Sequence, residues 1–146
     1  MAARVHFYHN TPDRLALACE LVANAHGRSR KVAVRCTTPE QLRTLDKLLW
    51  TAEPLSFIPH VPADHALASE TPVTLACAGE APNWPHGDVL LNLSDDLPAE
   101  HDAFRMVVEI VGHDAAERHA ARQRWMRYRE LGCELKAFDA ERREAL

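Results

Sequence analysis

Hydrophobic residues occur along the chain in two kinds of pattern, short continuous runs and longer stretches with helical spacing. Continuous apolar or β-prone runs predict strands over residues 5–8, 31–36, 73–77, 89–93 and 106–111. Spacings of three and four predict helices that begin at Thr11-Pro12, at the capping box Thr38-Pro39-Glu40-Gln41, and near residue 114. The first helix is expected to end at Gly27 and the third, over about residues 114–131, at Gly132.

The alternation of strands and helices predicts an α/β fold. We expect a single three-layer α/β/α domain over residues 1–146, with a mixed, mostly parallel sheet of Rossmann-like type. A last extended piece is expected to reach Phe138. The tail after Asp139 is expected to be frayed.

Composition indicates a folded, soluble, cytoplasmic protein. Hydrophobic residues make up 47% of the 146 residues and charged residues 26%, which favours a packed core over disorder. We find no secretion signal and no apolar run near the roughly 18 residues of a membrane span. The four cysteines lack metal-ligand spacing and are expected to be free, buried thiols, and no pair of the nine histidines has a metal-binding pattern. No metal and no cofactor is therefore expected.

Charge is distributed unevenly over the chain. Residues 48–104 contain nine acidic residues and no lysine or arginine, so this segment is not expected to bind nucleic acid. Arginines crowd instead into one short C-terminal stretch: Arg118, Arg122, Arg124, Arg127 and Arg129. This stretch predicts one cationic surface on an acidic protein, where an anionic partner would bind.

Motifs for catalysis or nucleotide binding are missing. None of the five glycines belongs to a phosphate-binding loop of the GxGxxG or GxxxxGK[ST] type, and no GxSxG elbow occurs. The turn after residue 93 contains Asp95-Asp96, a pair typical of a solvated turn. We expect no catalytic residues. The alternative is an orphan α/β enzyme or nucleotide-binding domain of unknown substrate.

Two segments are candidates for partner surfaces. In the third helix, Arg118, Arg122, Trp125 and Arg129 follow at offsets of four, three and four, which places them on one face. Such a face suits an acidic peptide with a hydrophobic end, because guanidinium groups bind carboxylates and the aromatic ring lines an apolar slot. The alternative is a solvated arginine face with Trp125 turned into the core.

The second segment lies between the second helix and the next predicted strand. It contains Trp50 at the helix end and Phe57-Ile58 between prolines. These aromatics either cap the core or meet a partner, since aromatic residues are enriched at protein interfaces.

Taken in order, several segments of the chain resemble the chi subunit family of DNA polymerase III. The resemblance rests on Phe7-Tyr8, Leu49-Trp50, Ser56-Phe57-Ile58-Pro59-His60, Pro72-Val73, Val89-Leu90-Leu91-Asn92-Leu93, Glu109-Ile110-Val111 and the run from Arg122 to Gly132. It implies an α/β/α fold without catalytic activity in the clamp-loader complex. It also implies two partners in DNA replication, the psi subunit and the acidic, hydrophobic-ended C-terminal tail of single-stranded DNA-binding protein.

The resemblance also implies roles for single residues. Arg122 looks like the principal contact to the tail, Arg118 like a flanking basic position, Trp125 like the adjacent aromatic, and Val111 like an apolar wall. Met126 stands where the family often has lysine, so Arg127 or Arg129 is expected to supply that charge.

For the second surface, Trp50 and Phe57 look like the family's contact for psi, and in some bacteria for a helicase that competes with psi. Strong direct binding to nucleic acid is not expected.

Overall fold

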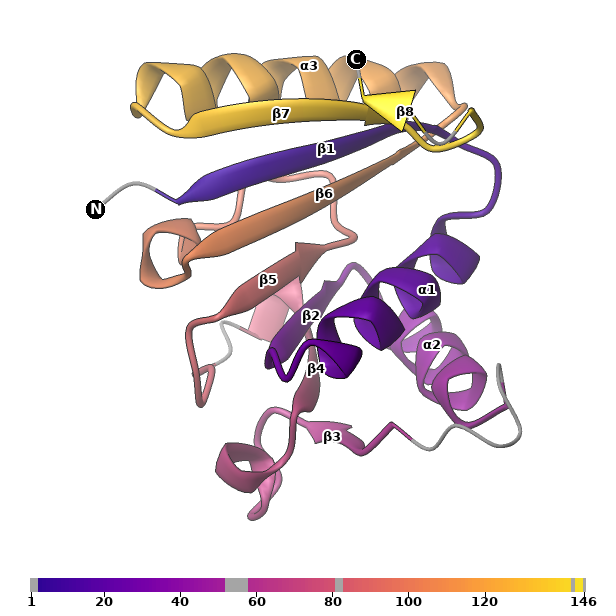
Figure 1. Ribbon diagram of the computed structural model, residues 1–146, viewed down its shortest axis with the longest axis vertical. Helices are drawn as coiled ribbons and strands as arrows, with labels where there is room; N and C mark the ends of the chain where they lie inside the picture. Colours follow the sequence, from indigo (N-terminus) through magenta and orange to yellow (C-terminus); the bar gives the residue numbers. More distant parts are fainter. Residues whose placement is uncertain (1–2, 52–57, 81–82, 143, 146) are drawn as a thin grey trace.

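The structure is a computed structural model, and it describes residues 3–51, 58–80, 83–142 and 144–145. These residues form one sheet with α-helices on both of its faces (Figure 1). The elements in chain order are β1 (Arg4–Thr11), α1 (Arg14–Gly27), β2 (Val32–Cys36), α2 (Pro39–Thr51), β3 (His60–Pro62), β4 (Val73–Cys77), β5 (Val89–Asn92), β6 (Met106–Gly112), α3 (Ala115–Glu130), β7 (Glu134–Asp139) and β8 (Glu144–Ala145).

The strands are ordered β3-β4-β2-β5-β6-β1-β7-β8. All neighbouring pairs are parallel except β7 with β8, which is antiparallel. The predicted mixed, mostly parallel α/β sheet is therefore confirmed. Each of the five predicted strands is present, while β3 and β8, both very short, were not foreseen.

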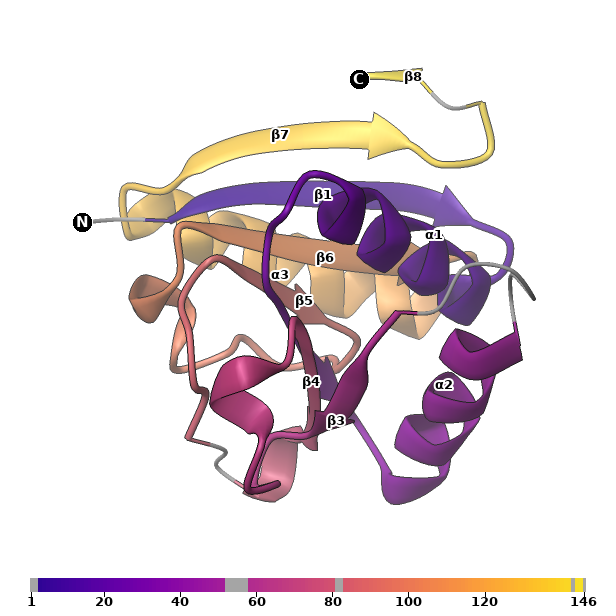
Figure 2. The ribbon, with the colours of Figure 1, turned by 60° about the horizontal axis from the view of Figure 1, so that its bottom comes forward.

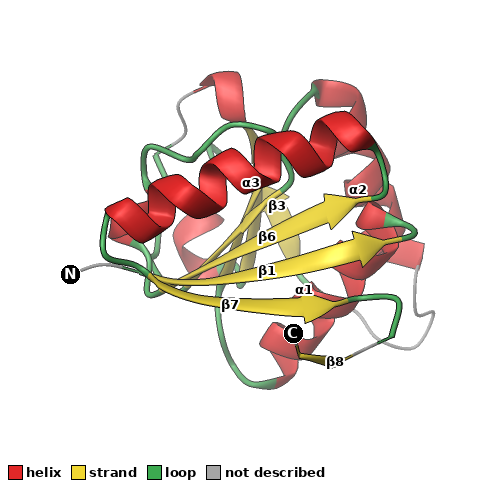
Figure 3. Ribbon diagram, turned by 90° about the horizontal axis from the view of Figure 1, so that it is seen from above, coloured by secondary structure: helices red, strands yellow, loops and turns green. Residues whose placement is uncertain are grey.

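Two hydrophobic clusters, one on each face of the sheet, form the core. Helices α1 and α2 pack over one face around Val22, Leu45 and Leu91. Helix α3 packs on the other face, against a cluster that includes Phe7 and Tyr128 (Figures 2 and 3). This arrangement gives the three layers expected from the sequence.

The start of α1 differs from the prediction. The helix begins at Arg14, and the Asp13 carboxylate caps it by accepting a hydrogen bond from the Ala16 N–H at 3.1 Å. Thr11 belongs to β1 instead, so the prediction of Thr11-Pro12 as cap and first turn was two residues early. An aspartate is an equally good cap, and the hydrophobic spacing could not decide between the two.

The other predicted helix ends agree with the structure. At the start of α2, the Thr38 hydroxyl accepts from the Gln41 N–H, and the Gln41 side chain accepts from the Thr37 N–H at 2.7 Å. Helix α3 ends at Glu130, and Gly132, two residues further on, has a φ of +82° in the left-handed region that glycine tolerates best. The chain then reverses directly into β7.

The C-terminal segment after Asp139 turns back toward β7. Asp139 accepts hydrogen bonds from the N–H groups of Glu141 and Arg142, which turns the chain back. Residues 144–145 then pair with β7 as β8. Strand β7 itself pairs in parallel with β1, from Arg4 opposite Glu134 to His9 opposite Asp139.

Candidate functional site

The exposed face of α3 carries the predicted cationic surface. Arg118, Arg122, Met126 and Arg129 are all exposed, and Met126 is exposed to 62%. Within the described ranges, no ion pair forms at Arg118, Arg122 or Arg129. Since their guanidinium groups retain most of their hydrogen-bonding capacity, they are available to an external carboxylate. We call Arg118, Arg122, Trp125, Met126 and Arg129 the α3 surface.

Trp125 connects this surface to the core. Its ring is half-buried and meets the Phe7 ring of β1 edge-on, with the centroids 5.2 Å apart. It also lies 6.4 Å from the His9 ring. The structure thus combines the two alternatives for Trp125, because one side of the ring packs on the core while part of it stays accessible. Val111 lies in the same hydrophobic cluster but is only 2% exposed, so it offers little surface before a partner binds.

Arg124 is not part of the cationic surface, and the prediction that placed it there was wrong. Its side chain is 5% exposed and forms an ion pair with the fully buried Glu109 of β6, with Nε 3.2 Å from Oε1. Its Nη1 donates to the Asp95 carbonyl at 2.7 Å. The reason is geometric. Arg124 and Arg122 are two positions apart, so they point to different sides of the helix. Arg127 is exposed but pairs with Glu130 at 3.2 Å.

Glu109 is the centre of a buried polar network that ties α3 to the sheet. The Tyr128 hydroxyl donates to Glu109 Oε2 at 2.8 Å, and Asn92 Nδ2 donates to both carboxylate oxygens at 3.0 and 3.1 Å. Burial raises the pKa of Glu109 above its usual value, although the nearby Arg124 charge opposes this shift. Burial also raises the pKa of Tyr128, with the Glu109 charge acting in the same direction. The hydroxyl is therefore protonated and able to donate.

The network continues through Asn92 to Arg35 of β2. Arg35 donates to Asn92, to the Ser94 hydroxyl and to both oxygens of Asp96, at 2.9 and 3.1 Å. The hydrogen bond from Arg35 lowers the pKa of Asp96 to about 2. The Asp96 carboxylate of the predicted turn is thus ion-paired, and it does not belong to a metal or catalytic pair.

Sequence reasoning missed this network, although two signals were present. Glu109 is the one charged residue within the apolar run of residues 106–111, where a carboxylate requires a buried partner. Arg124 is one of five arginines in the same stretch of the helix, and nothing in the sequence indicates that Arg124 is buried while the others are exposed. Only the packing of α3 against β6 distinguishes it from Arg122.

The second candidate surface is described only in part. Trp50, at the end of α2, is 52% exposed, and its ring centroid lies 4.7 Å from that of His60. The Nδ1 atom of the buried His60 ring is hydrogen-bonded to the Ile58 carbonyl at 2.7 Å, and an Asp46 carboxylate oxygen lies 3.1 Å from Nε2. Phe57 lies outside the described residues. Ile58, which the sequence grouped with Phe57, is 7% exposed and belongs to the core.

Cys19, Cys36 and Cys77 are buried, and Cys133 is partly exposed. A search of the described residues finds no cluster of three histidine, cysteine or acidic side chains that could hold a metal ion. None of the helices formed by the described residues is long and apolar enough to cross a membrane.

Comparison with known proteins identifies the family of this chain. A family model described as "DNA polymerase III chi subunit, HolC" matches residues 2–136. A protein of Pseudomonas aeruginosa named DNA polymerase III subunit chi is 36% identical over 133 residues, which cover 88% of this chain and 91% of the relative. The proteins of the same name from Haemophilus influenzae and Escherichia coli are each 29% identical, with 82% of this chain covered in both cases and 82% and 80% of the relatives. Because the family model matches over nearly the whole length and the Pseudomonas aeruginosa relative is more than 30% identical over most of both chains, this chain belongs to the chi subunit family of DNA polymerase III.

Proposed function

We propose that this chain is an adaptor that joins the psi subunit of the clamp-loader complex to the C-terminal tail of single-stranded DNA-binding protein. The chi family is one of accessory, non-catalytic subunits in DNA replication. The observation that carries the proposal is the α3 surface, where three arginines without ion pairs among the described residues surround a half-buried tryptophan.

The chemistry of the α3 surface matches that of the proposed tail. Arg122 would donate to a carboxylate at the end of the tail, and Trp125 would line the slot for its terminal hydrophobic residue. Arg118 and Arg129 would contribute at the rim, where solvent screens charge. Met126 is exposed where the family often has lysine, so it adds apolar contact, and Arg129 supplies a charge three positions further along the helix.

The buried Arg124–Glu109 pair supports this proposal, because it fixes the orientation of α3 on the sheet. A binding surface held on a rigid element loses less conformational entropy when its partner binds. Arg122 is thereby presented to the solvent from a helix whose inner side is anchored at several points.

Calorimetric titration of a synthetic tail peptide tests this site. Arg122→Ala should weaken binding by about 2–5 kcal/mol, or roughly 30-fold and more, whereas Arg118→Ala should cost about 0–1 kcal/mol. Arg43→Ala on α2 removes an equally exposed arginine on a different helix and should change nothing. Unchanged affinity in a folded Arg122→Ala variant would contradict the assignment.

For psi, we propose a contact centred on Trp50 and Phe57, which in some bacteria a competing helicase would share. The exposed Trp50 ring, which lies at a tilt against the buried His60 ring, supports this part of the proposal. Trp50→Ala should impair psi binding and leave tail-peptide affinity unchanged, because the two surfaces are on different helices. Leu67→Ala, which truncates another exposed hydrophobic side chain, is the matched control. Loss of both activities in a folded Trp50→Ala variant would refute the separation of the two surfaces.

A further inference from the structure

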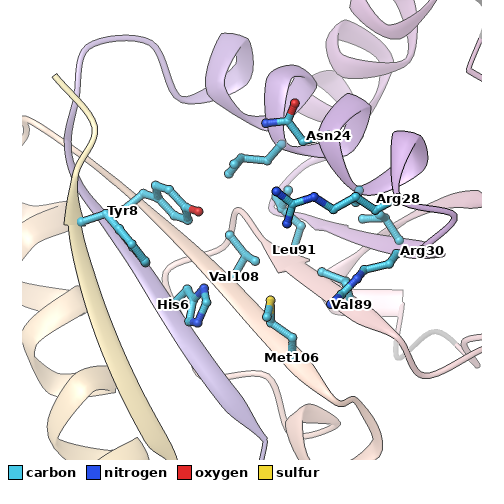
Figure 4. Close-up of a pocket in the computed structure, with 13 residues that line it drawn as sticks. His6, Tyr8, Asn24, Arg28, Arg30, Val89, Leu91, Met106 and Val108 are labelled. Atoms are coloured by element: carbon cyan, nitrogen blue, oxygen red, sulfur yellow. The ribbon is translucent and has the colours of Figure 1, made fainter. Parts of the chain in front are cut away.

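A groove runs beside α1 on the face of the sheet opposite α3. Its floor is formed by β5 and β6, one wall by β1 and β7, and the other wall by the C-terminal half of α1 (Figure 4). Its volume is about 250 Å³. We call this feature the α1 groove.

The groove exists because α1 and α2 do not cover the whole of this face. On β1, the side chains of His6 and Tyr8 point to this face, and Phe138 of β7 lies beside them. The Tyr8 and Phe138 rings are stacked, with centroids 4.9 Å apart. Facing them across the groove is Leu21 of α1, so the walls are aromatic and aliphatic.

Two arginines stand at one end of this apolar groove. Arg28 and Arg30 line it and are exposed, and within the part of the chain that the structure describes neither side chain has an ion pair. Burial lowers the pKa of His6, so its ring is neutral at pH 7 and does not change this balance. An apolar groove with unpaired cations at its mouth is complementary to an acidic partner that also has an apolar side chain.

The shape of the groove favours a polypeptide over a small ligand. The groove is elongated and continues into a further hollow at each end, so an extended chain segment can lie along it. A second hollow of about 200 Å³ adjoins it along α1, where Tyr8, Leu21 and Phe138 line both. At the other end, Arg30 and Met106 are shared with a wider hollow that includes Arg4 and Arg105.

We propose that the α1 groove binds an acidic segment of a partner polypeptide. The segment inserts a bulky apolar side chain between Leu21 and the Tyr8–Phe138 pair, and its carboxylates contact Arg28 and Arg30. This site is separate from the α3 surface, since the sheet lies between them (Figure 3). The protein can therefore hold one partner on each face.

Selection from a phage-displayed library of random peptides tests the proposal. The bait is the full chain with Arg122→Glu, so that acidic peptides are not captured by the α3 surface. We expect enriched peptides with several Asp or Glu residues around a Phe, Leu or Trp. In amide NMR spectra, the enriched peptide should shift the resonances of Tyr8, Leu21 and Phe138.

Charge variants separate specific binding from general attraction. Arg28→Glu/Arg30→Glu should weaken binding of the enriched peptide at least about tenfold, Arg28→Lys/Arg30→Lys should retain most of it, and Arg43→Glu should leave it unchanged. The proposal is overturned if no acidic peptide is enriched, if the shifts lie on α3 or around Trp50, or if the Arg28→Glu/Arg30→Glu variant binds normally. Decanoate binding at the groove as tightly as the peptide would also overturn it, in favour of a small amphiphile. Because the bait lacks Arg122, failure here leaves the tail-binding proposal untouched.

Discussion

Removing Arg124 should destabilise the protein far more than removing any arginine of the α3 surface. Arg124→Met keeps the apolar stem but leaves the carboxylate of Glu109, which is fully buried, without its cation. The Tyr128 hydroxyl and the Asn92 amide still donate to it, yet neither carries a charge. Breaking a buried ion pair from one side typically costs about 3–5 kcal/mol. Against a total stability of roughly 5–15 kcal/mol, this is a large fraction.

A second substitution tests the cause of that loss. Glu109→Gln in the Arg124→Met background removes the unpaired charge and keeps an oxygen that can accept from Tyr128. The double variant should therefore regain most of the lost stability, to within about 1–2 kcal/mol of wild type. Arg122→Met, on the exposed side of the same helix, should change stability by no more than about 0.5 kcal/mol.

Urea unfolding followed by circular dichroism measures the free energy of unfolding of wild type, Arg124→Met, Glu109→Gln, the double variant and Arg122→Met. The double-mutant cycle yields the coupling between positions 109 and 124 directly. The argument fails if Arg124→Met costs no more than Arg122→Met, or if the two losses at positions 109 and 124 simply add.

Three further outcomes follow from the charges and thiols. The isolated chain should bind a bare single-stranded oligonucleotide with a Kd weaker than about 1 µM at physiological salt in a fluorescence anisotropy titration, because its cationic stretch is short and carries few stacking aromatics. The Asp96 pKa is about 2 in the folded protein, below the ordinary 3.8, so the stability from its pairing with Arg35 is present above pH 4 and lost as the pH falls toward 2. Asp96→Asn should flatten the stability profile in that window, and an unchanged profile would contradict the assignment. Among the cysteines, Cys133 should react first with a thiol reagent, since burial raises the pKa of Cys36 to about 12; a fast phase that persists in Cys133→Ser would disprove this order.

The sequence predicted which residues form strands and helices better than it predicted which strands and helices lie next to one another. Continuous apolar runs such as Val73–Cys77 are buried on both faces of a parallel sheet, and this burial leaves a clear pattern. The short β3 has no such pattern, because its three residues range from buried His60 to exposed Pro62 and follow a proline-rich stretch. Strand order could not be predicted either, since pairing β1 between β6 and β7 depends on long-range packing.

The candidate site, too, could be predicted only in part from the sequence. Helical spacing alone placed Arg118, Arg122 and Arg129 on an exposed face, and the structure agrees. Spacing did not indicate that Arg124 turns inward, because that depends on Glu109, fifteen residues earlier on a different element. The family resemblance assigned roles to exposed residues, while the groove beside α1 has no sequence motif and became visible only when β1, β7 and α1 were brought together.

The side of the sheet where its parallel strands end is relevant to the alternative hypothesis that this is a nucleotide-binding protein. In nucleotide-binding sheets of this type, phosphate lies at the N-terminus of the helix that follows the first strand. Here the Asp13 carboxylate already caps that helix, so a phosphate would meet a negative charge. The neighbouring Arg14 guanidinium is also engaged, with the carbonyls of Leu93 and Ile110.

The same edge instead serves to anchor α3. Asn92, the last residue of β5, lies opposite Glu109 in the middle of β6, and Glu109 holds Arg124 and Tyr128 of the helix above. A buried ion pair adds little net stability compared with apolar packing, but it tolerates few alternative orientations, because each charge must keep its partner. The positions of Arg122 and Trp125, on which the proposed binding of the tail would depend, are then set by the packing of α3 on the sheet as well as by the helix itself.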